Sequence, residues 1–413
     1  MADISGRSTF GVARFDDRRS GRSTIFRDLG AVISARTLDD VRSALARAEE
    51  LARRGNWVYG FVSYEAAPAF DPALHVRDHS GAGSMPLCWF AAVPPDHVAH
   101  TDAPLDVAGR GSYRVGDWRM ADSVERYQGA VNTIREHIAA GEIYQANLTT
   151  RLDAAISGDL TAVYADLLAA QTCSYGAYID TGEHVVLSAG PELFFHWAEG
   201  RVTTRPMKGT ARRGRDSLED AALRAQLSAS AKDRAENLMI VDLLRNDLAR
   251  IPGARDIRVL SLFDAEPYET VWQLTSHIAA EVPDRTGLDS VFTALFPCGS
   301  VTGAPKYRSM EIIGELEATP RGLYCGAIGM IAPTGDGGID ATFSVAIRTL
   351  VHHRATGLAR YGVGGGVTWG STPSGEFAEA LTKARILDGL NSIERPLPVH
   401  GADGDTYSTQ KAG

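Results

Sequence analysis

The sequence lacks several features that would assign it to a class at once. Its 413 residues include only four cysteines, Cys88, Cys173, Cys298 and Cys325, and no CxxC pair. This spacing argues against a disulfide framework or a zinc site and favours a reducing compartment. No run approaches the roughly 18 consecutive apolar residues of a membrane-spanning helix, and MADISGRSTFGVARF has no apolar run typical of a signal peptide. We therefore expect a cytoplasmic protein that does not enter a membrane.

Lysine is also scarce, and the chain carries no excess of positive charge. Of the 42 basic residues only five are lysines, at positions 208, 232, 306, 383 and 411, and the net charge is −9. An acidic chain gives no support to nucleic-acid binding, which favours a basic patch. In a chain so rich in arginine, a retained lysine indicates a place where a compact, titratable amine is wanted. Codon bias is the alternative explanation.

Composition and pattern suggest three regions. Residues 1–115 form an N-terminal region that we expect to pack on the core, with a helix near Leu38–Arg54 and a strand at Trp57–Tyr64. Residues 116–395 are denser and more regular, and residues 396–413 are polar enough to predict a disordered tail. The whole length is ordinary for a globular protein of one to three domains.

The central region opens with a helix and a strand that the sequence specifies well. Asp122 is the predicted N-cap, Glu125 completes a capping box, and Gly141 ends the helix. The next segment, EIYQANLTTRL, alternates as a strand does. A strand with one polar face borders either water or a polar cavity, and the pattern does not decide between them. That polar face consists of Gln145, Asn147, Thr149 and Arg151.

Many further strand-like runs follow, with few helices between them. Helical patterns cover Leu218–Arg250, Lys306–Leu316 and Gly375–Leu390, and IDATFSVAIRTLV is predicted as one continuous strand. The strict strand–helix alternation of a doubly wound sheet is missing. The predicted fold class is α+β, with large, mostly antiparallel sheets flanked by helices.

Two acidic helices could share a divalent cation. Asp233 and Glu236 are three residues apart on one helix face, and Glu376, Glu379 and Lys383 share a face of another. Mg²⁺ takes carboxylate oxygens together with water and anionic oxygens of a substrate. The competing interpretation is a surface ion pair between Glu379 and Lys383, which would contribute roughly 0.2–0.5 kcal/mol.

Other segments indicate a site for a small anion. The run Gly364–Gly366 allows backbone N–H groups to approach an anion closely. SVTGAPKYRSME places small residues and a proline at a helix start, where exposed N–H groups favour a carboxylate or phosphate. Arg348 is suited to bidentate binding of a carboxylate. Together these segments describe a multiply charged anion beside a divalent cation.

The ordered motifs resemble those of one enzyme family. PELFF, RPMKGTARRG, KDRAENLMIVDLLRND, TGAPK, RGLYCGAIG, the segment ending in Arg348, and GGG followed by GEFAEALTKA occur in that order. They are similar to the motifs of chorismate-utilising enzymes, namely anthranilate, aminodeoxychorismate, isochorismate and salicylate synthases. The resemblance covers residues 117–390 and implies the sheet-rich fold of anthranilate synthase component I.

The resemblance also implies roles for individual residues. It makes Glu236 and Glu379 direct ligands of Mg²⁺, with Asp233 and Glu376 as supports through water, and it places the ring carboxylate of chorismate at the metal. Lys383 would assist there. The second carboxylate and the rest of the substrate would be bound by Arg348, Tyr324, Gly364, Gly365, Gly366, Thr302 and Gln145.

Two positions distinguish the branches of the family. Members that add water to chorismate carry a lysine base where this chain has Gln145, so the resemblance argues against isochorismate or salicylate synthesis. Lys208 stands where aminodeoxychorismate synthases carry lysine and anthranilate synthases carry alanine. It is expected to attack C2 of chorismate while Glu192 protonates the departing C4 hydroxyl. Burial and a cation such as Arg205 would depress the pKa of this lysine, although Lys208 could instead be an electrostatic anchor.

The resemblance leaves the ammonia source and the reaction class open to alternatives. No cysteine lies in a GxCxG context, so ammonia is expected from solution or from a separate glutamine amidotransferase subunit. The product could enter folate synthesis through 4-aminobenzoate or a secondary metabolite. The nearest alternative is anthranilate synthase component I, and an alternative of another class is a non-catalytic chorismate-binding or scaffold protein.

Overall fold

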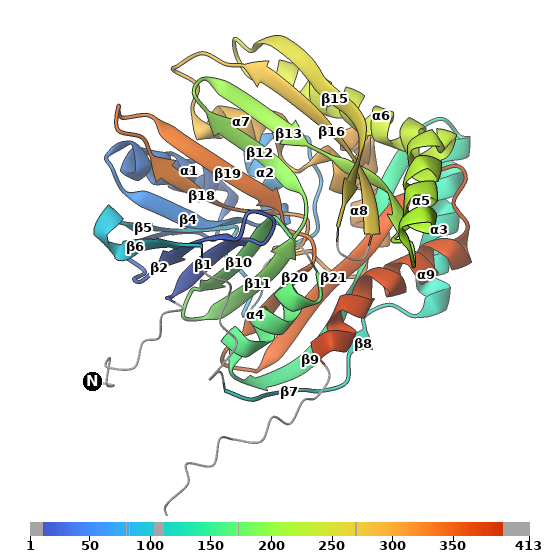
Figure 1. Cartoon of the computed structure of the whole chain (residues 1–413), viewed down its shortest axis with the longest axis horizontal. Helices are drawn as coiled ribbons and strands as arrows, with labels where there is room; N and C mark the ends of the chain where they lie inside the picture. Colours follow the sequence, from blue (N-terminus) through green and yellow to red (C-terminus); the bar gives the residue numbers. More distant parts are fainter. Residues whose placement is uncertain are drawn as a thin grey trace, which may run out of the picture.

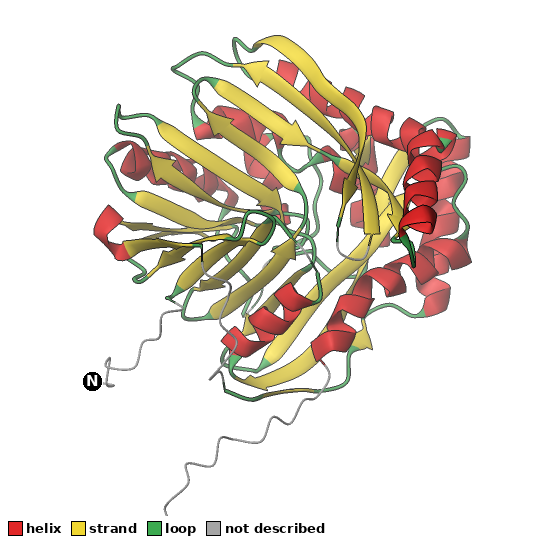
Figure 2. Ribbon diagram, viewed as in Figure 1, coloured by secondary structure: helices red, strands yellow, loops and turns green. Residues whose placement is uncertain are grey.

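The computed structural model describes residues 11–79, 81, 83–102, 111–171, 173–268 and 271–390. Two large sheets form its centre, and helices line their outer sides (Figures 1 and 2). All strand pairs within these residues are antiparallel. The α+β fold with mostly antiparallel sheets is therefore confirmed.

The first sheet has 11 strands and contains the polar strand that the sequence predicts. Its long strand β9 pairs with β21 over ten residue pairs, from Leu358↔Ala155 to Val367↔Ala146. In order, the sheet comprises β17 (Gly303–Ala304), β9 (Gln145–Gly158), β21 (Leu358–Val367), β20 (Thr349–His353), β11 (His184–Gly190), β10 (Tyr175–Asp180), β1 (Ala13–Asp17), β2 (Arg22–Phe26) and β6 (Val98–Thr101), with β7 (Tyr113–Val115) and β8 (Arg119–Met120) also paired to β9.

The second sheet has 10 strands and faces the first. It comprises β14 (Met207–Arg212), β16 (Val271–Glu281), β13 (Arg201–Arg205), β12 (Leu193–Ala198), β19 (Ile339–Val345), β18 (Ala327–Pro333), β4 (Trp57–Val62), β5 (Cys88–Val93) and β3 (Ala31–Ala35), with β15 (Arg255–Pro267) also paired to β16. Strands before residue 115 thus pair with later strands in both sheets. The division at residue 115 stays a prediction, and the predicted tail lies outside the described residues.

Helices cover the outer face of each sheet. The helices are α1 (Leu38–Arg53), α2 (Ala67–Phe70), α3 (Val124–Ala139), α4 (Leu160–Ala169), α5 (Ser217–Ala229), α6 (Ala231–Ala249), α7 (Leu288–Leu295), α8 (Lys306–Leu316) and α9 (Pro373–Ala384), with short 3₁₀ turns η1 (Tyr64–Ala66), η2 (Pro95–His97), η3 (Gly299–Val301) and η4 (Arg385–Leu390). Helices α1, α6 and α7 pack on the second sheet, whereas α3, α4 and α9 pack on the first. None of the helices in the described ranges has the length and apolar character needed to cross a membrane.

Three apolar clusters hold these layers together. One lies between the second sheet and its helices, one between the first sheet and its helices, and one between the two sheets. Phe26 of the first sheet packs against Tyr59 of the second, with ring centroids 4.3 Å apart. Such burial is the main favourable term in folding. The sheets are thereby fixed face to face, and the polar side of β9 turns toward the interior.

Several local predictions are confirmed and others are wrong. Helix α8 has the predicted bounds, and Gly141 has the positive φ of 75° expected just after a helix. Asp122 is not the N-cap of α3, because Ser123 accepts the bond from the Arg126 N–H, and Asp122 forms an ion pair of 2.9 Å with Arg126 instead. The predicted helix Leu218–Arg250 is two helices that meet at Ser230, whose side chain caps α6.

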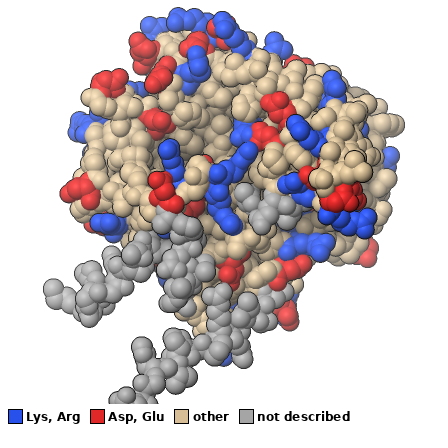
Figure 3. Space-filling model, viewed as in Figure 1, with Lys and Arg blue, Asp and Glu red and all other residues tan. Residues whose placement is uncertain are grey.

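Charged side chains of both signs lie on the surface. On the face seen in Figure 3, acidic side chains lie among the basic ones.

The aromatic core predicts one strong stability effect. Phe343 of β19 is fully buried, and its ring centroid lies 5.2 Å from that of Phe195 and 5.3 Å from that of Phe292. Replacing Phe343 by alanine should lower the free energy of unfolding by about 3–5 kcal/mol, measured by urea denaturation. Leu218→Ala, at a position 82% exposed, is the control and should change it by less than about 0.5 kcal/mol. Equal effects would contradict this core assignment.

Candidate active site

The glycine run at the end of β21 is the point where the predicted site residues meet. A Cβ placed on Gly366 would lie 3.3 Å from Nζ of Lys208 and 3.7 Å from Oε1 of Gln145. A Cβ on Gly365 would lie 3.2 Å from Oε2 of Glu376, 3.3 Å from Oε1 of Glu379 and 3.5 Å from Nζ of Lys383. A larger residue at Gly366 would therefore crowd Lys208 and Gln145, and one at Gly365 would crowd the three side chains of α9. The structure brings five predicted side chains together around two glycines.

Lys208 reaches this point from the edge strand β14. The next residue, Gly209, has a φ of 92°, and a Cβ there would lie 3.0 Å from Cβ of Asp233. Glycine is thus required for β14 to pass close to α6. This close approach places the lysine between the two acidic helices.

Burial lowers the pKa of the Lys208 ammonium below its usual 10.5, and the charge of Lys383 lowers it further. The carboxylates of Glu192, Glu236 and Glu379 act in the opposite direction. The prediction that Arg205 supplies the neighbouring cation is wrong, because Arg205 forms an ion pair with Glu266. The neighbouring cation that lowers the pKa of Lys208 is Lys383.

Glu192 lies buried between β11 and β12, with 4% of its surface exposed. Burial raises the pKa of its carboxyl group to about 7, against the effects of a hydrogen bond from Ser300 and the charge of Lys208. Its Oε1 has no hydrogen-bond partner within the described part of the chain. A carboxyl group with these properties can donate a proton near neutral pH.

The four acidic candidates come from two helices that cover different sheets. Burial raises the pKa of Glu236, and the charges of Asp233 and Glu379 add to this effect. Burial also raises the pKa of Glu376, whose Oε1 accepts a hydrogen bond of 2.5 Å from Ser371. The pKa of Glu379 is low: burial would raise it, but Lys383, 2.8 Å away, outweighs burial.

These carboxylates fit a hard divalent cation by their chemistry. Oε2 of Glu376 is buried and has no hydrogen-bond partner among the described residues, so it is free to take a ligand. The oxygens are of the type that Mg²⁺ prefers. They do not form a compact preformed cage: within the described ranges, the set of three or more possible ligand atoms that all lie within 4.8 Å of one another is that of Glu183, His184 and His353.

Arg348 does not lie on a strand, contrary to the prediction. The segment IDATFSVAIRTLV divides into β19 of the second sheet and β20 of the first, and Arg348 lies between them with a φ of 54°. Burial lowers the pKa of its guanidinium, while Tyr361 and Tyr324 oppose this. Its side chain forms no ion pair with the rest of the described structure, so it is available for an anion.

Tyr324 and Thr302 occupy the surrounding loops. The Tyr324 ring packs on Gly362, where a Cβ would lie only 2.2 Å from its Cγ. Thr302 is fully buried, and its hydroxyl donates to the carbonyl of Cys298 at 3.2 Å. In the residues that the structure covers, no hydrogen bond joins Arg348 or Tyr324 to Lys208.

Two residues of this region were missed by the sequence analysis. Ser300 bonds to Glu192, and Arg321 links the loop before Tyr324 to its neighbours. The Arg321 guanidinium donates to the carbonyls of Val301 and Asn147 at 2.8 and 2.6 Å. The available signals were the motif RGLYCGAIG, which begins at Arg321, and the anion-site segment SVTGAPKYRSME, which begins at Ser300.

Comparison with known proteins gives a consistent picture. Residues 13–388 match the family described as chorismate binding enzyme. The chain is 38% identical over 275 residues to aminodeoxychorismate synthase component 1 of Escherichia coli, covering 66% of this chain and 59% of the relative. It is 35% identical over 280 residues to anthranilate synthase component 1 of Aquifex aeolicus, covering 67% of this chain and 55% of that relative. The aligned part therefore spans less than two thirds of each relative.

A solved structure shows the same fold. Anthranilate synthase component I of Streptococcus pneumoniae matches with a TM-score of 0.73 and 23% identity, covering 88% of this chain and 91% of that one. The predicted likeness of fold to anthranilate synthase component I is thus confirmed.

The depressed pKa of Lys208 can be measured directly. Reductive methylation with ¹³C-formaldehyde gives few lysine signals, since the chain has only five lysines, and loss of one signal in Lys208→Arg assigns it. We expect this amine to titrate below its usual 10.5. Lys383→Met should raise the value, because a neighbouring positive charge is removed. Titration at or above 10.5 in the unsubstituted protein would contradict the described environment.

Proposed function

This chain belongs to the chorismate binding enzyme family, and from that premise we propose that it converts chorismate and ammonia to 4-amino-4-deoxychorismate. The observation that carries the proposal is the amine of Lys208, which lies beside Gly366 and is electrostatically coupled to Glu192. Relatives named aminodeoxychorismate synthase component 1 support this choice.

Lys208 is the nucleophile in this proposal. Its neutral amine attacks C2 of chorismate, both ring double bonds shift, and the C4 hydroxyl leaves as water with the proton of Glu192. Ammonia then adds at C4, both double bonds shift back, and the C2–nitrogen bond breaks to release the lysine. The low pKa of Lys208 and the raised pKa of Glu192 favour the two protonation states that this step needs.

A magnesium ion is part of the proposal. Glu236 and Glu379 would hold it directly, with Asp233 and Glu376 acting through water. When bound, the ion would neutralise the ring carboxylate of chorismate. Lys383 already donates to the carbonyl of Gly364 at 2.8 Å, which keeps its charge beside this carboxylate position.

The other carboxylate is assigned to Arg348, Tyr324 and the backbone of Gly364–Gly366. The unpaired guanidinium of Arg348 supports this assignment, since arginine binds carboxylates in a bidentate manner. Gln145, 1% exposed, presents an amide Nε2 without a hydrogen-bond partner in the described structure. An amide cannot act as a general base, which favours ammonia over water as the incoming group.

Ammonia is proposed to come from a separate glutamine amidotransferase subunit, and the component 1 names of relatives support this. Product use in folate synthesis through 4-aminobenzoate is part of the same proposal. A cytoplasmic location also remains a proposal, supported by four cysteines that are all free thiols.

Product analysis tests the role of Lys208. With chorismate, Mg²⁺ and ammonium, the unsubstituted protein should form aminodeoxychorismate, detected by mass spectrometry, and EDTA should stop turnover. Lys208→Ala should lose at least about a hundredfold in rate, because the nucleophile is gone. Arg354→Ala, at an exposed arginine that pairs with Asp180, is the control and should keep its rate. Release of anthranilate and pyruvate would instead identify an anthranilate synthase, and no turnover would favour the non-catalytic alternative.

The pH dependence tests Glu192. As its pKa is raised to about 7, the acid form is present below that pH and is lost above it. We expect kcat/KM to fall as the pH rises above about 7, and Glu192→Gln to lose about 10²–10⁴-fold in rate together with this alkaline decline. A Glu192→Gln enzyme with an unchanged profile would exclude Glu192 as the acid.

A further inference from the structure

A cavity lies against the first sheet, beside the candidate active site. Its volume is about 210 Å³, and it is lined by the inner faces of β9, β20 and β21 and by the loops around residues 79–85 and 318–324. Of the predicted site residues, only Tyr324 lines it. The cavity is therefore separate from the group around Lys208, although Tyr324 forms part of its wall.

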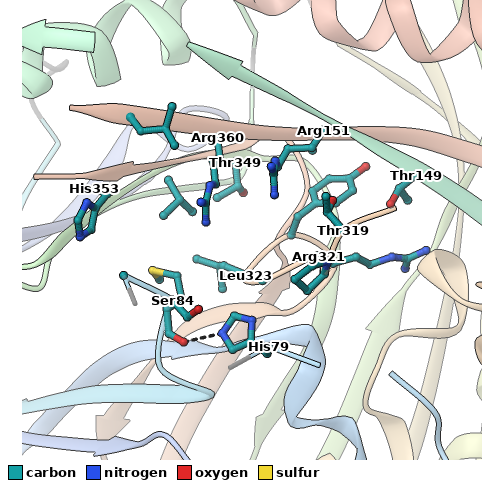
Figure 4. A pocket seen from close by; sticks show the side chains of 18 of the residues that line it. His79, Ser84, Thr149, Arg151, Thr319, Arg321, Leu323, Thr349, His353 and Arg360 are labelled. Carbon is teal, nitrogen blue, oxygen red and sulfur yellow. Dashed lines mark hydrogen bonds between the residues drawn. The ribbon is translucent and has the colours of Figure 1, made fainter. Parts of the chain in front are cut away.

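The cavity contains one cation that has no ion pair in the described structure, and the nearby Asp153 offsets only part of its charge. Arg151 is paired with Asp153 at 2.9 Å, and Arg321 with Glu317 at 2.7 Å. Arg360 lines the cavity and forms no ion pair or hydrogen bond with any described residue. In Figure 4, Arg360 and Arg151 extend side by side from the strands into the cavity.

The acidic lining residue does not offset this charge. Asp122 is already engaged by Arg126 at 2.9 Å and by the hydroxyl of Thr150 at 2.7 Å. Burial lowers the pKa values of His79 and His184, so these imidazoles are neutral at pH 7 and can donate or accept hydrogen bonds. Nδ1 of His184, a residue 2% exposed, has no partner in the described chain. The polar side of the cavity thus offers one free positive charge and unused hydrogen-bonding capacity.

The rest of the lining is apolar. Met85, Leu323, Val351 and Leu358 contribute aliphatic surface, and Pro320 adds to it. A cavity of about 150 Å³ lined by apolar side chains can take a benzene ring, so this one has room for a ring with a polar substituent. Ligand sites commonly combine an apolar wall with a few polar groups that fix orientation.

We propose that this cavity binds a small monocarboxylate with a ring-sized apolar body, whose carboxylate pairs with Arg360 beside Arg151. Chorismate is a poor candidate, because its second carboxylate would have no cation here: Arg151 and Arg321 are already paired. A charge-assisted bidentate contact with Arg360 leaves the ring against Leu323 and Val351.

The position of the cavity makes it suited to control the neighbouring site. Leu323 and Tyr324 belong to the loop that Arg321 ties to Asn147 and Val301. A ligand against Leu323 would therefore act on the loop that carries Tyr324. Through Tyr324, a bound ligand would change the KM for chorismate. That change in KM rests on the proposed function, whereas binding of the carboxylate in the cavity does not.

Equilibrium dialysis with benzoate tests the site without requiring turnover. The full chain should bind benzoate, and the neutral benzamide should bind at least about tenfold more weakly, because the charged contact is lost. Arg360→Gln should weaken benzoate binding by a similar factor. Arg354→Gln is the matched control: this arginine is exposed, pairs with Asp180 at 3.2 Å and does not line the cavity. It should leave benzoate binding unchanged.

Two further measurements distinguish this cavity from the chorismate site. Lys208→Ala should keep benzoate binding, and Leu358→Trp, at a partly exposed lining position, should remove it by filling the cavity. Equal binding of benzoate and benzamide, or full binding by Arg360→Gln, would overturn the proposal. Loss of benzoate binding in Lys208→Ala would also overturn the proposal, and so would displacement of benzoate by chorismate. Either result would place the benzoate site at Lys208. Failure of chorismate turnover alone would affect only the proposed function.

Discussion

The site depends on a strand end that has no side chains. At Gly365 and Gly366 even one added carbon would lie 3.2–3.7 Å from two carboxylates, two lysine ammonium groups and an amide oxygen. Because the backbone leaves this space open, charged groups of β14 and of helix α9 can come close to this strand. Their mutual effects and their burial then set the pKa values of Lys208 and Glu192 in the directions that covalent catalysis needs.

Much of this arrangement could be predicted from the sequence. Periodicity predicted α8 with its observed bounds, and the fold class followed from many strand runs with few helices. The acidic pairs were identified because residues three or four apart share a helix face. Local rules of this kind do not show which helices meet. That Glu236 of α6 and Glu379 of α9 both act on Lys208 depends on the packing of two sheets, and only the family resemblance indicated it.

The failures have identifiable physical reasons. The alternation through Arg348 continues without a break in the sequence, yet the chain passes there from one sheet to the other, which a pattern of period two does not reveal. Asp122 and Ser123 are both good caps, and the ion pair with Arg126 decides between them. The polar face of β9 could face water or protein, and in the structure Gln145, Asn147 and Thr149 are buried. Apart from the local pair of Asp122 and Arg126, these outcomes depend on parts of the chain that are distant in the sequence.

The most direct test of the account is a search for the covalent intermediate on Lys208. The enzyme would be incubated with chorismate and Mg²⁺ without ammonia, quenched in acid, digested and examined by peptide mass spectrometry. The account predicts that the peptide containing Lys208 carries the mass of chorismate less one water. An unmodified Lys208, in a preparation that forms aminodeoxychorismate when ammonia is added, would contradict it.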